Sequence, residues 1–69
     1  MLNSKIIGER LRKLRKEHGL SQVSFAQEIG ISPSAVAMYE QGERIPRDET
    51  KIVIAKFYNV SIESIFFTQ

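Results

Sequence analysis

Apolar residues recur along the chain at the spacing of an α-helix. The first such segment is Ser4–His18. Its residues Ile7, Leu11 and Leu14 lie four and three positions apart, which places them on one face of a helix. Gly19 follows at the position where a left-handed C-cap is favoured. The segment therefore predicts a first helix.

Three serines stand at the expected starts of further helices. Ser21, Ser32 and Ser61 can each accept a hydrogen bond from a backbone N–H in the turn that follows. At each serine, the residue before it and the residue four positions after it are apolar, a pairing called the hydrophobic staple. The pairs are Leu20 with Phe25, Ile31 with Val36, and Val60 with Ile65. The repeated pattern predicts three helix starts.

The second expected helix begins at the cap Ser21 and stops at Gly30. It carries Phe25, Ala26 and Ile29 toward the core. Ala26 is small, which allows a second helix to cross close to it, and Gly30 suits a turn that needs a positive φ. These residues predict a short helix followed by a tight turn.

The third expected helix follows its cap Ser32 and opens with Pro33, whose missing N–H costs nothing at the first helical position. It runs to Gln41 and stops at Gly42. Val36 is the apolar wedge between this helix and the one before it. Two short helices joined by a turn of about three or four residues form a helix-turn-helix motif.

Two more helices are expected in the last third of the chain. The stretch Glu43–Arg47 contains Pro46 and is predicted to be irregular, and a helix over Asp48–Tyr58 follows it. The last turn or two begin at the cap Ser61. The helix is expected to supply Ile54, Ala55 and Tyr58 to the core, and the last turns carry Ile62, Ile65 and Phe66.

The whole pattern predicts an all-α fold, a compact five-helix bundle that forms one domain over residues 1–69. The chain shows no strand-like alternation, internal repeat or low-complexity tract. A domain of this size buries only about 60% of the surface that its unfolded chain exposes. Its stability must come from compact apolar packing and well-capped helices.

Composition excludes several functional classes. The chain has no cysteine, which excludes disulfides and cysteine-ligated zinc and favours a reducing compartment. No apolar run approaches the roughly 20 residues needed to span a bilayer, so we expect a cytoplasmic protein without membrane contact. His18 is the single histidine and no glycine-rich loop is present, so catalysis lacks its usual parts. We expect no enzyme activity, cofactor, metal or small-molecule ligand.

Positive charge is concentrated near the start of the chain. The net charge is only +2, but residues 5–16 hold six of the ten basic residues and the single acid Glu9. This distribution is compatible with an anionic partner, but by itself it favours a solvated helix face.

The segment Gly19–Pro46 resembles the phage-repressor, or xenobiotic-response-element, family of helix-turn-helix regulators. The most specific matches are Ser21-Gln22, Phe25-Ala26 and the run Tyr39–Pro46, and the similarity extends from Ile7 through Phe66. The resemblance implies a five-helix domain of the lambda-repressor-like type. It also implies that the third helix enters the major groove of double-stranded DNA, usually as part of a two-fold dimer on a palindromic operator.

The third helix has a face suited to reading base edges. Val36 and Tyr39 point to the core, and the opposite side carries no charge and little bulk. A major groove about 12 Å wide admits such a helix. The expected base-reading residues are Pro33, Ser34, Ala37, Met38 and Gln41. Among them, Pro33 can offer no more than van der Waals contact through its side chain.

Other residues are expected to bind the DNA backbone. Gln22 resembles the family's phosphate-contacting glutamine at the N-terminus of the second helix, where free N–H groups and the helix dipole favour an anion. Arg10, Arg44 and Arg47 are candidate phosphate clamps, although each could equally be a solvated charge.

Arg15 and Glu40 match the family's internal ion pair between the first and third helices, so we assign them to structure. At the end of the chain, Phe66 and Phe67 cannot easily both be buried in one short helix. The surplus suggests a homodimer interface, and a simple monomer core is the alternative.

The resemblance favours a sequence-specific DNA-binding transcriptional regulator, and specifically a repressor that acts as a dimer. The alternative is an interaction module, such as an antitoxin, that uses the same fold to bind a protein.

Overall fold

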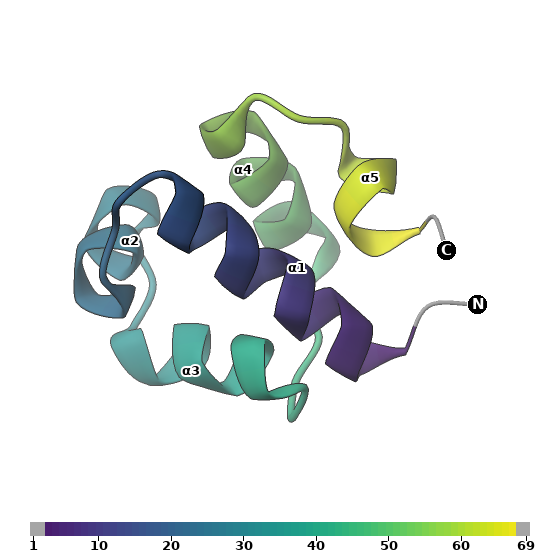
Figure 1. Cartoon of the computed structure of the whole chain (residues 1–69), viewed down its shortest axis with the longest axis horizontal. Helices are drawn as coiled ribbons and strands as arrows, with labels where there is room; N and C mark the ends of the chain where they lie inside the picture. The colour runs from purple at the N-terminus through teal and green to yellow at the C-terminus, as the bar shows by residue number, and fades with distance from the viewer. Residues whose placement is uncertain (1–2, 68–69) are drawn as a thin grey trace.

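The computed structural model of the chain describes residues 3–67, and this range contains five α-helices and no strand (Figure 1). In chain order they are α1 (Ser4–Glu17), α2 (Gln22–Ile29), α3 (Pro33–Gln41), α4 (Asp48–Tyr58) and α5 (Ile62–Phe66). The predicted all-α, five-helix fold is confirmed, and the expected helix ends differ from the observed ones by about one residue.

The serine caps form as the sequence predicts. Ser21, Ser32 and Ser61 accept hydrogen bonds from the backbone N–H three residues later, at 3.0, 3.1 and 3.2 Å. Asn3 caps α1 in the same way, accepting from the N–H of Ile6 at 2.9 Å. Each cap satisfies a donor that would otherwise lack a partner, so the starts of α1, α2, α3 and α5 are defined locally. The α4 helix begins after Arg47 without a side-chain cap.

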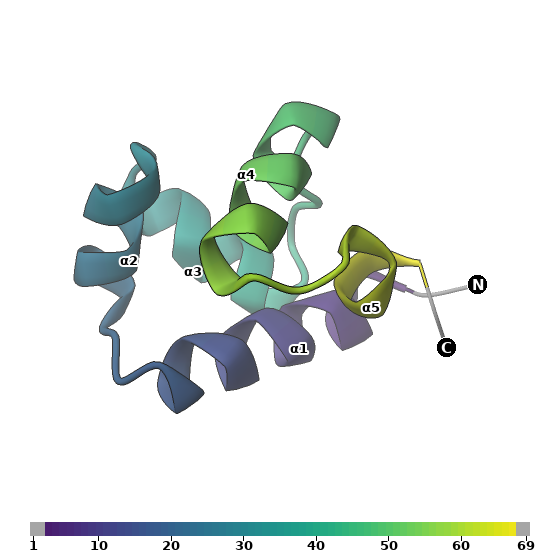
Figure 2. The same cartoon turned by 90° about the horizontal axis from the view of Figure 1, so that it is seen from above.

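The α1 helix crosses the molecule in the view of Figure 1 and lies along one side of it in the view of Figure 2. It packs on α3 and on α5, while α2 packs on α3 and α4, and α4 also contacts α5. The helix-turn-helix pair therefore rests on α1 and α4, and α5 closes the other end of the core.

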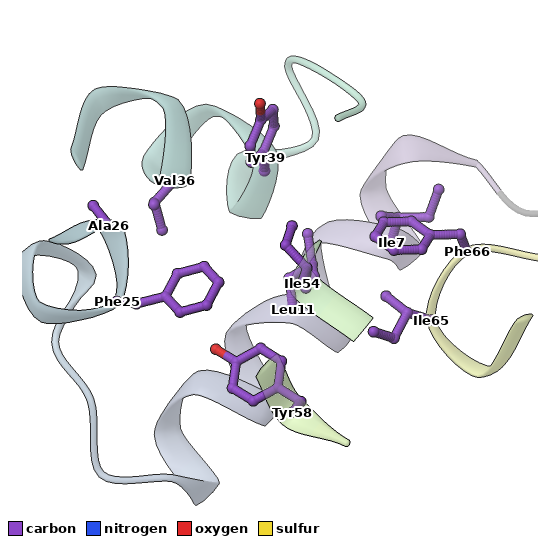
Figure 3. Packing of buried hydrophobic residues seen from close by; sticks show 10 residues of the cluster. All are labelled: Ile7, Leu11, Phe25, Ala26, Val36, Tyr39, Ile54, Tyr58, Ile65 and Phe66. Atoms are coloured by element: carbon purple, nitrogen blue, oxygen red, sulfur yellow. The ribbon is translucent and has the colours of Figure 1, made fainter. Parts of the chain in front are cut away.

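The core lies where these helices meet (Figure 3). Ala26 and Ile54 are fully buried, as expected for a small residue at a helix crossing and a branched residue at the centre. Leu14, Ile29 and Ile62 pack against its edge. The buried apolar residues are Ile7, Leu11, Phe25, Ala26, Val36, Tyr39, Ile54, Ala55, Tyr58, Ile65 and Phe66.

The two phenylalanines at the end of α5 have different environments. Phe66 is only 3% exposed and packs in the monomer core (Figure 3), whereas Phe67 is 57% exposed. The assignment of Phe66 to a dimer interface was therefore wrong, because its side chain is already buried by its own chain. The assignment of Phe67 stays a prediction.

Gly8 allows α1 to approach α3 very closely, a role that the sequence analysis did not identify. A Cβ at this position would lie 2.5 Å from the carbonyl oxygen of Glu40 and 2.6 Å from that of Tyr39. These are backbone atoms near the end of α3, which cannot move away as a flexible side chain could. The contact sets how closely the two helices cross.

We expect Gly8→Ala to lower the free energy of unfolding by about 2 kcal/mol, because overpacking outweighs the gain in helix propensity. Urea denaturation of the two proteins measures the difference. Gly30→Ala is the control: its φ is 78° with nothing within 4 Å of the added Cβ, so only strain of about 1 kcal/mol applies. An increase in stability for Gly8→Ala would contradict the close helix approach.

Candidate nucleic-acid interface

The outward side of α3 is open to solvent. Val36 and Tyr39 point inward and are 2% and 7% exposed, so the other side of the helix faces away from the bundle (Figure 1). Ala37 is half-buried, and the remaining residues of this side are exposed. We call this side the reading surface; it consists of Pro33, Ser34, Ala37, Met38 and Gln41. The predicted orientation of α3 is confirmed.

The turn between α2 and α3 sets the angle of the reading surface. Gly30 ends α2 with a φ of 78°, the left-handed conformation that the sequence predicts. The carbonyl of Ala26 accepts hydrogen bonds from the N–H groups of Gly30 and Ile31, at 2.9 and 3.0 Å. The Ile31 bond is the 6→1 bond of a Schellman motif and the Gly30 bond is the 5→1 bond of an αL C-cap. The α3 helix starts immediately after the next residue, Ser32. The two helices are therefore held in a defined orientation.

A nearly buried ion pair joins α1 to α3. Arg15 donates from Nε to Glu40 Oε2 at 2.7 Å and from Nη2 to Oε1 at 3.0 Å. Its Nη1 also donates to the carbonyl of Leu20 at 2.8 Å. The two charged side chains are only 9% and 6% exposed. The predicted structural pair is confirmed, and it has the bidentate geometry that an arginine and a carboxylate favour.

The same carboxylate also holds the start of α2. Gln22 donates from Nε2 to Glu40 Oε1 at 3.2 Å. One carboxylate thus connects α1, the first residue of α2 and the end of α3. Gln22 is placed at the helix N-terminus, as predicted, and its contact with DNA phosphate stays a prediction. The hydrogen bonds to Glu40 raise the pKa of Arg15 above its ordinary value, although burial acts in the opposite direction.

Tyr58 belongs to a cluster of aromatic rings with Phe25, Phe57 and His18. Its ring stacks on Phe25 at a centroid distance of 5.3 Å and contacts His18 at 4.8 Å. Burial raises the pKa of Tyr58 to about 12, and the negative charge of Glu40 adds to this effect. The hydroxyl finds no hydrogen-bond partner among the described residues. The Tyr58 phenol therefore stays protonated and uncharged at neutral pH.

Arg12 faces the α2–α3 pair, a placement that the sequence analysis missed. A polar pocket of about 230 Å³ opens between α1, the start of α2 and the end of α3. Its lining residues are Arg12, Arg15, Gln22, Glu40 and Gln41. The sequence feature that could have predicted this placement is the spacing of three residues between Arg12 and Arg15, which puts both on one side of α1.

Arg10 points elsewhere. Its guanidinium donates from Nη1 to the carbonyl of Ser64 at 2.8 Å and that of Ile65 at 3.4 Å, so it joins α1 to α5. The assignment of Arg10 as a phosphate clamp is corrected: residues two positions apart on a helix differ by about 200° in direction. Arg10 and Arg12 therefore face opposite sides of α1.

The two remaining candidate clamps follow α3. Arg44 and Arg47 are exposed in the irregular segment between α3 and α4. In the sequence, both follow Gln41, the last residue of the reading surface, by three and six positions. Their position is compatible with the flanking phosphate contacts that the sequence predicts, and these contacts stay predictions.

Two short helices joined by residues 30–32, with an exposed and uncharged side on the second one, define a helix-turn-helix domain. Residues 11–65 match the family model described as helix-turn-helix, and the chain belongs to this family. No helix within the described residues is long and apolar enough to cross a membrane.

Curated proteins of known name are similar to this chain in sequence. The cryptic phage CTXphi transcriptional repressor RstR of Vibrio cholerae is 35% identical over 60 residues, which are 87% of this chain and 54% of RstR. The antitoxin PezA of Streptococcus pneumoniae is 37% identical over 60 residues, or 87% of this chain and 38% of PezA. The resemblance to phage repressors is confirmed. This chain spans about half the length of RstR and less of PezA.

The fold also matches a solved structure closely. The crystal structure of the restriction-modification controller protein C.AhdI from Aeromonas hydrophila has a TM-score of 0.83 and 30% sequence identity. The match covers 91% of this chain and 96% of C.AhdI. The five-helix arrangement therefore occurs in a controller protein of nearly the same extent.

We expect Glu40→Gln to lower the free energy of unfolding by about 3 kcal/mol, because it leaves the Arg15 charge without a counter-ion in a nearly buried site. Urea denaturation at neutral pH measures the loss. The control is Asp48→Asn, which breaks the Lys51–Asp48 pair, where the charges are 3.6 Å apart and Asp48 is 93% exposed. The control should lose less than about 1 kcal/mol. Equal losses of unfolding free energy in the two variants would show that the Arg15–Glu40 pair stabilises the fold no more than an exposed ion pair does.

Proposed function

We propose that this chain is a sequence-specific DNA-binding domain of a transcriptional regulator, a repressor that binds a palindromic operator as a dimer. The observation that carries the proposal is the reading surface: an exposed, uncharged side of a short helix whose two ends are anchored to the bundle. The names of the phage repressor RstR and the controller protein C.AhdI support the same class.

The chemistry of the reading surface fits the major groove. Groove edges offer hydrogen-bonding groups on every base pair and a methyl group on thymine. Ala37 and Met38 suit apolar contact with that methyl, while Ser34 and Gln41 can hydrogen-bond to base edges. Met38 is 38% exposed, so its side chain is accessible to a groove edge. We infer that Met38 provides much of the apolar base contact.

Phosphate contacts on both sides of α3 would orient it in the groove. At one side, Gln22 is the first residue of α2, whose N-terminal N–H groups can donate to a phosphate. Arg12 adds a positive charge to the adjoining polar pocket. At the other side, Arg44 and Arg47 follow the end of α3. Such contacts supply affinity and salt dependence without selecting a sequence. Arg12 replaces Arg10 in this set.

A second function is favoured by one relative. PezA is an antitoxin, so an interaction module that binds a protein partner is the other candidate for this chain. Both candidates are non-enzymatic and both would act in the cytoplasm. They differ in whether the isolated domain selects a DNA sequence.

Selection of bound sequences from a random DNA duplex pool tests the proposal. We expect an enriched inverted repeat whose two half-sites are centred one helical turn apart, about 34 Å. An enriched site without two-fold symmetry would contradict the dimer. No enrichment at all would contradict the DNA-binding function and favour the protein-partner alternative.

We expect Met38→Ala to weaken binding to the selected operator by about 1 to 3 kcal/mol while hardly changing binding to unrelated duplex DNA. The matched change Arg47→Ala should weaken both, because a phosphate contact is present on any sequence. Fluorescence anisotropy at one fixed salt concentration compares the two DNAs. If Met38→Ala weakens both equally, Met38 does not read bases.

A further inference from the structure

The α4 helix has a second, outward-facing apolar side. Its inner side buries Ile54, Ala55 and Tyr58 in the core. On the outer side, Ile52 and Val53 are 48% and 44% exposed. When another surface covers two adjacent, half-exposed apolar side chains, their removal from water lowers the free energy.

Charged residues flank this apolar pair symmetrically. Glu49 and Lys56 are exposed and lie three residues before Ile52 and three residues after Val53. The four positions follow the spacing of a single helical stripe. Within residues 3–67 neither Glu49 nor Lys56 forms an ion pair. We call Glu49, Ile52, Val53 and Lys56 the outer stripe.

The outer stripe is complementary to itself. When two copies of a helix pack antiparallel about a two-fold axis, positions equally distant from the midpoint of the stripe face each other. With the midpoint between Ile52 and Val53, Ile52 packs on the partner's Val53. The same axis brings Glu49 to the partner's Lys56, and the reverse pair forms on the other side. An isologous contact of this kind needs no other protein.

We propose that the outer stripe is the homodimer contact and that its occupant is a second copy of this chain. The proposal rests on the dimeric DNA-binding function above and names the surface responsible. The stripe lies on α4 and the reading surface on α3, so the two proposed contacts use different residues. Ile45, just before α4, and Phe67, whose ring centroid is 5.1 Å from Lys51 Nζ, add exposed apolar area next to α4.

The contact is small, which sets the expected strength of the dimer. A stable interface buries about 1,200 to 2,000 Å² in total, whereas the outer stripe is one side of an 11-residue helix. We therefore infer a weak dimer in free solution that forms fully on a palindromic operator, where DNA holds both copies close together.

A charge-swap experiment tests the contact. Sedimentation equilibrium over a concentration series measures self-association of the wild type, Glu49→Lys, Lys56→Glu, an equimolar mixture of the two variants, and the double variant. Each single variant faces like charges at both ends of the stripe and should dimerise about tenfold more weakly. The mixture and the double variant restore opposite charges at both ends and should associate at least as well as the wild type.

A second comparison tests the apolar centre of the stripe. Ile52→Ser should weaken self-association, whereas Val23→Ser, at a residue that is 51% exposed on α2, should leave it unchanged. Circular dichroism confirms that all variants are folded. Wild type that stays monomeric both in solution and on the operator would overturn the proposal, as would single variants that associate normally or a mixture that does not recover.

Binding to a single half-site separates this proposal from the function itself. If the outer stripe is the contact, the single variants lose cooperative binding to the operator but bind an isolated half-site as the wild type does. Failure of the wild type to bind a half-site would contradict the DNA-binding function. Sedimentation equilibrium would still show whether the outer stripe of α4 forms the dimer contact.

Discussion

The ion pair between Arg15 and Glu40 is the interaction on which the candidate interface depends. Glu40 accepts hydrogen bonds from Arg15 and Gln22, so a single carboxylate holds α1, the start of α2 and the end of α3 together. Removing its charge would leave the arginine desolvated without compensation, which is far more costly than losing an exposed pair. The position of the reading surface relative to the N-terminus of α2 therefore depends on one nearly buried group.

The α1 helix connects several parts of the fold, because different sides of it contact different helices. Gly8 brings it against the backbone of α3, which allows the ion pair to form over a short distance. Arg10 joins it to α5, and Arg12 points into the polar pocket beside α2. The cluster of positive charge in residues 5–16 is thus divided between internal support and the proposed DNA-binding surface.

The division of roles among the helices explains how a 69-residue chain can carry two interaction surfaces. Both α3 and α4 are short helices with one side in the core, and the opposite side of each is available to a partner. On α3 the available side is uncharged and suits base edges. On α4 it is apolar at the centre and oppositely charged at its ends, which suits a second copy of itself. The proposed DNA contact and the proposed dimer contact therefore use different helices.

Sequence alone determined the five helices, their serine caps, the turn at Gly30 and the exposed side of α3, because helical periodicity and caps depend on residues a few positions apart. It also supplied the Arg15–Glu40 pair, through resemblance to a family. Only the tertiary structure decided that Phe66 is buried, that Arg12 rather than Arg10 faces the proposed DNA side, and that Gly8 is a contact point. These outcomes depend on how helices far apart in the chain cross each other, and no local pattern specifies that geometry.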